Sequence, residues 1–165
     1  MSAGVDSVVM AYLFHNLGLL AGIAHYNFGF RGEESDGDEA FVRELAARYN
    51  FPVFVTHPDV KRFAKNTSVS TQMAARELRY EWFEKVRAEA GYEWIATAHH
   101  ANDSLETLLL NLARGTGLAG MTGIAPVNGA LVRPLLYSNR EEISRYAAEN
   151  GILRREDWTN ETDDY

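Results

Sequence analysis

The stretch that decides the fold is Ile95-Ala-Thr-Ala-His99-His100-Ala-Asn-Asp103-Ser-Leu-Glu106-Thr107. Its apolar beginning predicts a buried strand, which ends abruptly at two histidines. Asp103 stands where an N-cap is expected and Glu106 follows three residues later, so the pattern predicts a helix that begins there. Open α/β sheets build ligand sites where strands end against helix N-termini. A capping box beside a buried histidine is the structural alternative, but four polar groups within 99–106 favour a site.

On both sides of this stretch, helical and strand patterns alternate. Four strands are expected, at residues 21–26, 53–56, 94–98 and 130–133. The expected helices span 6–17, 35–50 with a Ser35-x-x-Asp38 box, 60–65, 71–90, 103–114, and 138–150 with a Ser138-x-x-Glu141 box. Such alternation predicts an α/β fold, a Rossmann-like parallel sheet with helices on both faces.

Composition narrows the class of protein. The chain has 165 residues, 46% of them hydrophobic, which is enough for one domain with a core of its own. It has no cysteine, which excludes a disulfide framework, a thiolate zinc site and cysteine catalysis, and which fits a reducing cytoplasm. No apolar stretch approaches the roughly 20 residues that span a bilayer, so no membrane partner is expected. The net charge of −7 argues against binding nucleic acid by bulk electrostatics alone.

The loop before the first helix has the composition of an anion site. Residues 2–7, Ser-Ala-Gly-Val-Asp-Ser, are mostly small, and a helix N-terminus offers unpaired N–H groups to a phosphate. Asp6 would repel a bare phosphate, so its natural partner there is Mg²⁺ held on phosphate oxygens. An ordinary helix cap formed by Asp6 or Ser7 is the alternative interpretation.

This loop is similar to the pyrophosphate-binding loop of the N-type ATP pyrophosphatases, the PP-loop superfamily, which cleave ATP between its α and β phosphates. The usual form is Ser-Gly-Gly-x-Asp-Ser, so Ala3 replaces a glycine. If the position requires a positive φ, Ala3 is strained there. The strand that should lead into the loop is missing, so we expect a fragment with a truncated first strand.

Further motifs resemble the tRNA(Ile)-lysidine synthetase family from residue 2 to about residue 160. They are His25-Tyr-Asn-Phe-Gly-Phe-Arg31-Gly-Glu-Glu-Ser35-Asp-x-Asp38-Glu39, Ala75-Arg-Glu-Leu-Arg79-Tyr80, the His99–Thr107 stretch, Arg114-Gly-Thr-Gly117 with Gly120 and Gly123, Arg133-Pro-Leu-Leu136, and Glu156-Asp-x-Thr-Asn160. Phe28 departs from the family, which usually carries a second histidine at this position. The expected organisation is one catalytic domain over 1–165, with the family's C-terminal tRNA-binding domains absent.

The resemblance implies a carbon–nitrogen ligase. In this family, ATP adenylates the C2 carbonyl oxygen of the wobble cytidine in tRNA(Ile) with a CAU anticodon. The ε-amine of free L-lysine then attacks C2 and expels AMP, which leaves lysidine. ATP and Mg²⁺ are therefore the expected cosubstrate and metal, and the resemblance leaves open whether the chain works as a homodimer.

The resemblance and the physics together assign roles to individual residues. Asp6 and Asp103 are expected to share Mg²⁺ on the α and β phosphates, and His99 to stabilise the α-phosphate or move a proton, with His100 as a second candidate. Glu106 resembles the residue that holds the lysine amine. The residues expected to contact ATP are Ser2, Ala3, Gly4, Val5, Asp6, Ser7, Ala24 and His25.

Arg79 is the expected partner of a phosphate or of the developing adenylate, because a guanidinium matches such anions. An ion pair with Glu77 or Glu81 is its structural alternative. The attacking lysine must lose a proton, and His99 and Asp103 are both candidate bases. Residues 31–35 are read either as a flap over the nucleotide or as a solvated turn, and 116–123 either as a contact to the tRNA backbone or as a plain loop.

Two other functions fit the same residues. One is another PP-loop ATP pyrophosphatase that acts on tRNA, such as a thiolase, although thiolases of this group usually need cysteines. The other is a catalytically impaired nucleotide-binding fragment, in which Ala3 and the missing strand abolish turnover.

Overall fold

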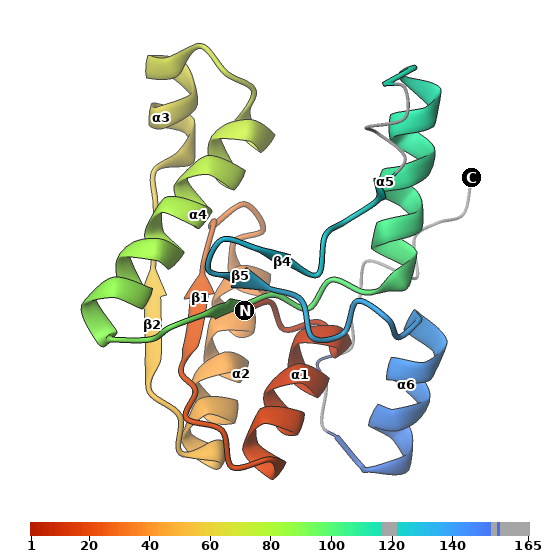
Figure 1. Ribbon diagram of the computed structural model, residues 1–165. Coiled ribbons are helices and arrows are strands. Elements are labelled where there is room, and N and C mark those ends of the chain that lie inside the picture. The colour runs from red at the N-terminus through yellow and green to blue at the C-terminus, as the bar shows by residue number, and fades with distance from the viewer. Residues whose placement is uncertain (117–121, 153–154, 156–165) are drawn as a thin grey trace. The chain divides into compact units, whose positions relative to one another are not determined.

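The computed structural model describes residues 1–116, 122–152 and 155, and its helices and strands are labelled in Figure 1. The chain divides into two compact units. Unit 1 comprises Met1–Ala3 and Phe14–Ile95, and unit 2 comprises Gly4–Leu13 and Ala96–Tyr165. The predicted motif residues 117, 120 and 156–160 lie outside the described part of the chain.

Unit 1 is built on two parallel strands. β1 (Ile23–Tyr26) pairs with β2 (Val53–Thr56), with Ile23 opposite Val53 and Tyr26 opposite Thr56 (Figure 1). The crossover between them is α2 (Glu33–Tyr49), which ends at Asn50 in the left-handed conformation. The helix packs on the strands through buried apolar side chains, namely Ile23, Val42 and Ala46. The carboxyl ends of both strands therefore meet at one edge of this sheet.

The second half of unit 1 is a pair of helices. α3 (Val60–Thr67) is capped by Asp59, which accepts a hydrogen bond from Arg62 N at 3.0 Å. α4 (Thr71–Ala90) is capped by Ser70. The two helices pack against each other through an apolar cluster, and Phe28 from the loop after β1 packs against this cluster. The buried residues of the cluster are Val60, Ala64, Ala74 and Ala75. This loop is thus packed against α3 and α4 through an aromatic ring.

Unit 2 holds the second sheet, whose strand order is β3-β5-β4. β3 (Ile95–Ala96), β4 (Val127–Asn128) and β5 (Leu131–Val132) are short, and Thr97 N donates to Val132 O at 3.0 Å just beyond β3. Most of α1 (Val5–Asn16) belongs to this unit, together with α5 (Ala101–Ala113) and α6 (Arg140–Glu149). The starts of α5 and α6 are tied together, because Arg140 N donates to Asn102 Oδ1 at 3.1 Å.

Three predicted helix starts are wrong, all for the same reason. α2 begins at Glu33, so Ser35 lies inside the helix, and α6 begins after Asn139, whose Oδ1 accepts from Glu142 N at 2.9 Å. α5 begins after His100, so Asp103 is the third helical residue and Glu106 is not its capping partner. In each helix, several polar residues near the start satisfy the box pattern, and the pattern alone does not choose among them.

One pair of strands departs from the expected parallel arrangement, and β4 was not among the four expected strands. β4 and β5 form an antiparallel hairpin, with Val127 opposite Val132. Its two-residue turn begins with Gly129, whose φ of 58° suits a tight hairpin. A glycine there was a readable signal, but the strands are too short to show an alternating pattern.

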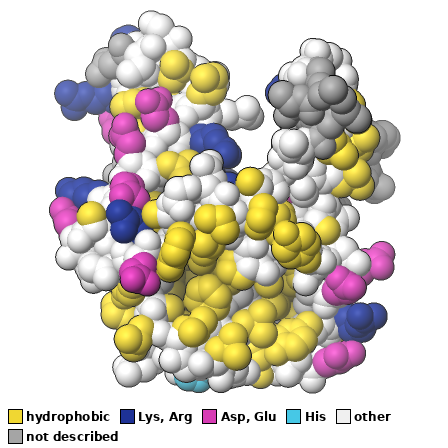
Figure 2. All heavy atoms as spheres, viewed as in Figure 1, with side chains coloured by type: hydrophobic (Ala, Val, Ile, Leu, Met, Phe, Trp, Pro, Cys, Tyr) yellow, Lys and Arg dark blue, Asp and Glu magenta, His cyan; other side chains and the backbone are white. Residues whose placement is uncertain are grey.

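Exposed leucines mark one face of α5. Leu105, Leu109 and Leu112 are 54%, 57% and 47% exposed and follow each other at helical spacing, so they share a face. Figure 2 shows hydrophobic side chains among the atoms on the viewed surface. α5 therefore presents part of its apolar surface outward. Within the described residues, no helix is both long and apolar enough to cross a bilayer.

Candidate nucleotide site

Two carboxylates in unit 2 contact the same imidazole. Asp6, in the first turn of α1, places Oδ2 3.8 Å from Nε2 of His100, and Asp103, in the first turn of α5, places Oδ2 3.5 Å from Nδ1. Because the two nitrogens lie on opposite edges of the ring, His100 stands between the carboxylates. We call Asp6, His100 and Asp103 the acidic cluster.

Helix starts fix the members of the acidic cluster. Val8 N donates to Gly4 O at 3.2 Å, which is the first hydrogen bond of α1 and puts Asp6 in its first turn. His100 is the extended N-cap of α5, and its N–H donates to Asp103 Oδ2 at 2.8 Å. The positive end of a helix dipole favours negative charge. Both carboxylates therefore lie in first turns, where the helix dipole favours a negative charge.

The acidic cluster keeps unused polar atoms. Asp6 Oδ1 and His100 Nδ1 are buried and have no hydrogen-bond partner within the described part of the chain. An unpaired buried carboxylate oxygen is costly, by about 1–3 kcal/mol or more. Asp6 Oδ1 is therefore an oxygen that a ligand could pair.

Mg²⁺ fits these residues. It prefers carboxylate oxygens and usually takes one or two of them, with phosphate oxygens and water completing its shell. In the described ranges, no group of three or more His, Asp or Glu side chains could hold a metal ion by itself. Asp6 and Asp103 would each supply carboxylate oxygens of the kind that Mg²⁺ prefers.

The two histidines of the motif have different surroundings. His99 Nδ1 lies 2.9 Å from Thr97 Oγ1, whereas His100 contacts both carboxylates. The sequence reasoning put His99 first, and the structure brings His100 into the cluster. The position of His100 in the sequence could have indicated this role. The last residue before a helix lies next to the side chains of that helix's first turn, and His100 directly precedes α5. Glu106 lies one turn beyond Asp103 on α5 and is exposed.

In unit 1, the end of β1 meets the first residue of the chain. The Met1 amine donates to Ala24 O, and Met1 O lies 2.7 Å from His25 Nδ1. A carbonyl only accepts, so Nδ1 carries the proton and Nε2, buried and unpaired among the described residues, is an acceptor. Burial lowers the pKa of His25, which keeps its ring neutral.

Arg79 belongs to the same part of unit 1. The pKa of the Met1 amine is lowered to about 5, first by burial and then by the positive charge of Arg79. The predicted alternative, an ion pair with Glu77 or Glu81, is not present in the described part of α4, where ion pairs join Glu84 to Arg87 and Lys85 to Glu89. The Arg79 guanidinium lies 5.5 Å from the centroid of the Tyr80 ring.

The profile of the PP-loop domain matches residues 1–165. The chain belongs to the PP-loop family. It is 49% identical over its full length to a protein of Bacteroides thetaiotaomicron and 40% identical to one of Chlorobaculum tepidum, both named tRNA(Ile)-lysidine synthase. These alignments cover 39% and 51% of the two relatives, so the chain spans about two fifths to one half of their length.

A solved structure confirms the predicted α/β fold. The U34-tRNA thiolase NcsA from Methanococcus maripaludis, with its [4Fe-4S] cluster, superposes with a TM-score of 0.72 over 94% of this chain and 57% of that one. At 18% sequence identity the likeness concerns the fold alone.

The PP-loop itself tolerates its unusual alanine. Ala3 is buried at 7% exposure. Among the described residues, the non-glycine positions with positive φ are Asn50 and Ser68, so Ala3 does not adopt the left-handed conformation. The condition under which Ala3 would be strained, a positive φ, is therefore not met.

Phe28, where the family usually has histidine, serves the core of unit 1. Its ring lies 4.9 Å from that of Tyr26 and 5.4 Å from that of Phe30, and it packs on the α3–α4 cluster. Phe28→His is expected to destabilise the fold by about 2 kcal/mol, because a polar ring replaces an apolar one in this packing. Urea denaturation measures this loss.

Phe30→His is the matched control, since Phe30 is 52% exposed. It should cost less than about 1 kcal/mol. Equal losses in the two variants would show that Phe28 has no special packing role.

Proposed function

We propose that the chain is the ATP-using part of a tRNA(Ile)-lysidine synthase. It adenylates the C2 carbonyl oxygen of the wobble cytidine in CAU-anticodon tRNA(Ile) and releases pyrophosphate; the ε-amine of L-lysine then attacks C2 and displaces AMP. The relatives' names support the substrate. The observation that carries the chemistry is the acidic cluster, with a buried and unpaired oxygen on Asp6 beside the PP-loop.

Adenylation depends on position and charge neutralisation. Asp6 and Asp103 would hold Mg²⁺, which when bound neutralises charge on the α and β phosphates. The N-terminus of α1 would offer N–H groups to the pyrophosphate, along the motif Ser2, Ala3, Gly4, Val5, Asp6 and Ser7. Ala24 and His25 would contact adenosine, and Arg79 would bind a phosphate or the adenylate.

The second step needs a neutral amine. Free lysine has a pKa of about 10.4, so a base must accept its proton. His99 and Asp103 remain the two candidates for this base. Glu106, one helical turn from Asp103, would hold the ammonium group before the proton is removed.

The other PP-loop interpretation is a thiolase, a class of enzyme that shares this fold. The 165 residues contain no cysteine, so they supply no thiolate to a cluster. This absence favours the ligase, and it also accords with the reducing cytoplasm in which we place the reaction. A second copy of the chain remains a possible partner that size-exclusion chromatography tests.

The test is release of pyrophosphate from ATP in the presence of L-lysine and a CAU-anticodon tRNA transcript. We expect full turnover only with all three substrates, at low salt, because a chain of charge −7 binds tRNA weakly. The matched control is the same transcript with uridine at the wobble position. Turnover with uridine would favour another tRNA-modifying reaction, and ATP binding without turnover would favour an impaired nucleotide-binding fragment.

A further inference from the structure

We propose that Glu39 is a positioning residue, which holds the loop of residues 27–32 against α2 in the arrangement that binds ATP at the end of β1. The inference rests on the proposed function, because it takes Ala24 and His25 as part of the adenosine site. Glu39 itself lies on α2 and is not one of the residues proposed to contact the nucleotide. It would act through the loop.

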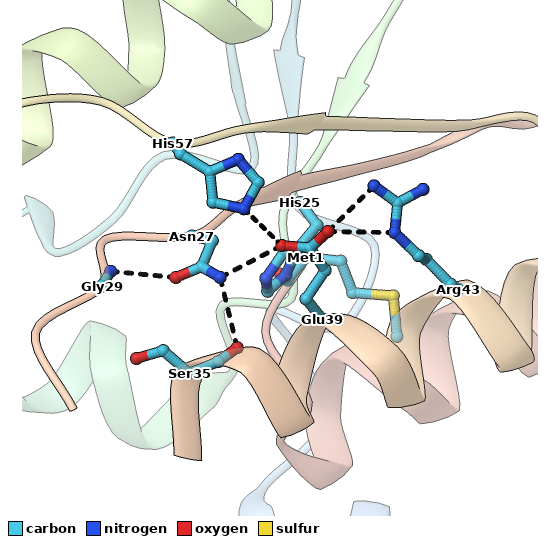
Figure 3. Close-up of polar contacts among 8 residues, drawn as sticks. All are labelled: Met1, His25, Asn27, Gly29, Ser35, Glu39, Arg43 and His57. Atoms are coloured by element: carbon cyan, nitrogen blue, oxygen red, sulfur yellow. Dashed lines mark hydrogen bonds and ion pairs between the residues drawn. The ribbon is translucent and has the colours of Figure 1, made fainter. Parts of the chain in front are cut away.

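Glu39 connects three segments of unit 1 (Figure 3). Its Oε2 accepts hydrogen bonds from Asn27 Nδ2 at 3.1 Å and from His57 Nε2 at 2.6 Å. Its Oε1 accepts from Arg43 Nε at 3.0 Å. Asn27 directly follows β1 and His57 directly follows β2, so a single carboxylate binds the carboxyl ends of both parallel strands to α2.

Asn27 connects Glu39 to the backbone of the loop. Its side chain is buried, its Nδ2 also donates to Ser35 O at 3.3 Å, and its Oδ1 accepts from Gly29 N at 2.9 Å. The start of the loop and the first turn of α2 are thus joined through one amide. A further bond, from Arg31 N to Ser35 Oγ at 3.2 Å, closes the loop tip.

The negative charge on Glu39 is what holds these donors. Burial would raise the pKa of Glu39, but hydrogen bonds from Asn27, Arg43 and His57 outweigh it and lower the pKa to about 2. The carboxylate is therefore ionised at neutral pH, and hydrogen bonds to an ionised acceptor are about twice as strong as neutral ones. Burial lowers the pKa of His25, and the negative charge of Glu39 partly opposes this lowering.

The location of this network predicts which kinetic constant depends on it. Residue 27 follows the proposed adenosine-contacting residues within two positions, whereas the acidic cluster belongs to unit 2. Loosening the loop should weaken ATP binding and leave the chemical step unchanged. Such a variant raises KM with kcat preserved.

The experiment compares Glu39→Gln with Glu44→Gln. Glu44 lies on the same helix, is exposed, and loses the same charge without touching the network. We expect Glu39→Gln to raise KM for ATP about 10-fold with kcat within about 2-fold, because charge-assisted bonds are lost. Trypsin should also cleave after Arg31 about 10-fold faster, because the loop opens more often. Glu44→Gln should match the wild type in both measurements.

The cleavage assay needs no activity, so it separates this inference from the proposed function. Equal cleavage of the two variants overturns the positioning role, and faster cleavage with unchanged KM overturns its link to ATP. A wild-type chain that binds no ATP overturns the proposed function, and the link to ATP falls with it. If Glu39→Gln does not fold, as judged by circular dichroism, His57→Ala removes one donor from the exposed side and should shift both readouts the same way, by about 3-fold.

Discussion

Asp6→Asn is expected to lower the rate of pyrophosphate release by about 100- to 1000-fold without lowering the stability of the fold. The substitution keeps the size of the side chain and removes its charge. The proposed reaction loses one of two carboxylates beside the phosphates, and removing one preorganised electrostatic group commonly has an effect of this size. The folded chain, in contrast, loses a carboxylate with a buried oxygen that has no hydrogen-bond partner in the described residues.

A loss of activity without a loss of stability would distinguish a ligand-binding role of Asp6 from a structural one. A residue kept only for packing or capping lowers stability when it is replaced, whereas a residue kept for a ligand often costs stability in the free protein. The rate is measured with saturating ATP over a range of Mg²⁺ concentrations, and the melting temperature by thermal denaturation. Glu149→Gln, an exposed change of charge on α6, is the control. Full activity in Asp6→Asn would exclude Asp6 from the site.

Several elements were predictable because their signals are local. β2 and α4 have the bounds expected from the sequence, since Pro52 precedes the strand, Ser70 caps the helix and Gly91 ends it at a φ of 75°. The expectation that Asp6 and Asp103 converge follows from a rule of topology, in which polar residues at strand ends and helix starts meet at one edge of a sheet. In the structure each carboxylate contacts His100, and their sharing of Mg²⁺ stays a prediction.

The position of His100 was harder to predict, because it depends on the exact residue at which α5 begins. The motif allows α5 to start at Asp103 or earlier, and His100 N donating to Asp103 Oδ2 settles the start at Ala101. With that start, His100 is the N-cap of α5 and contacts both carboxylates. A box pattern fixes such a start only to within a turn.

The network around Glu39 could not be predicted from the sequence. Its members are separated by 12 residues between Asn27 and Glu39 and by 18 between Glu39 and His57. No local periodicity or capping rule links such positions. They meet because β1 and β2 are parallel neighbours in register, a tertiary fact that a single sequence does not contain.

Glu39 should also govern how unit 1 responds to acid. The pKa of Glu39 is about 2 in the folded chain, against about 4.3 for an unperturbed glutamate. A lowered folded-state pKa contributes stability above the unfolded-state value, and this contribution disappears as the pH falls from about 4.3 towards 2. Glu39→Gln is therefore expected to destabilise the fold by about 2–3 kcal/mol at pH 7, and by progressively less below pH 4.5.

Urea denaturation of the wild type and Glu39→Gln at pH 7, 4.5 and 3 measures this difference. Glu44→Gln is the control, because its side chain is exposed on the same helix and the comparison removes the general effect of acid on carboxylates. The Glu39 side chain is 15% exposed, so solvent screens its hydrogen bonds only in part and the effect should survive added salt. A difference between wild type and Glu39→Gln that stays constant from pH 7 to pH 3 would mean that its charge does not hold the strand ends together. Packing of its aliphatic stem on α2 would then be the source of any stabilisation.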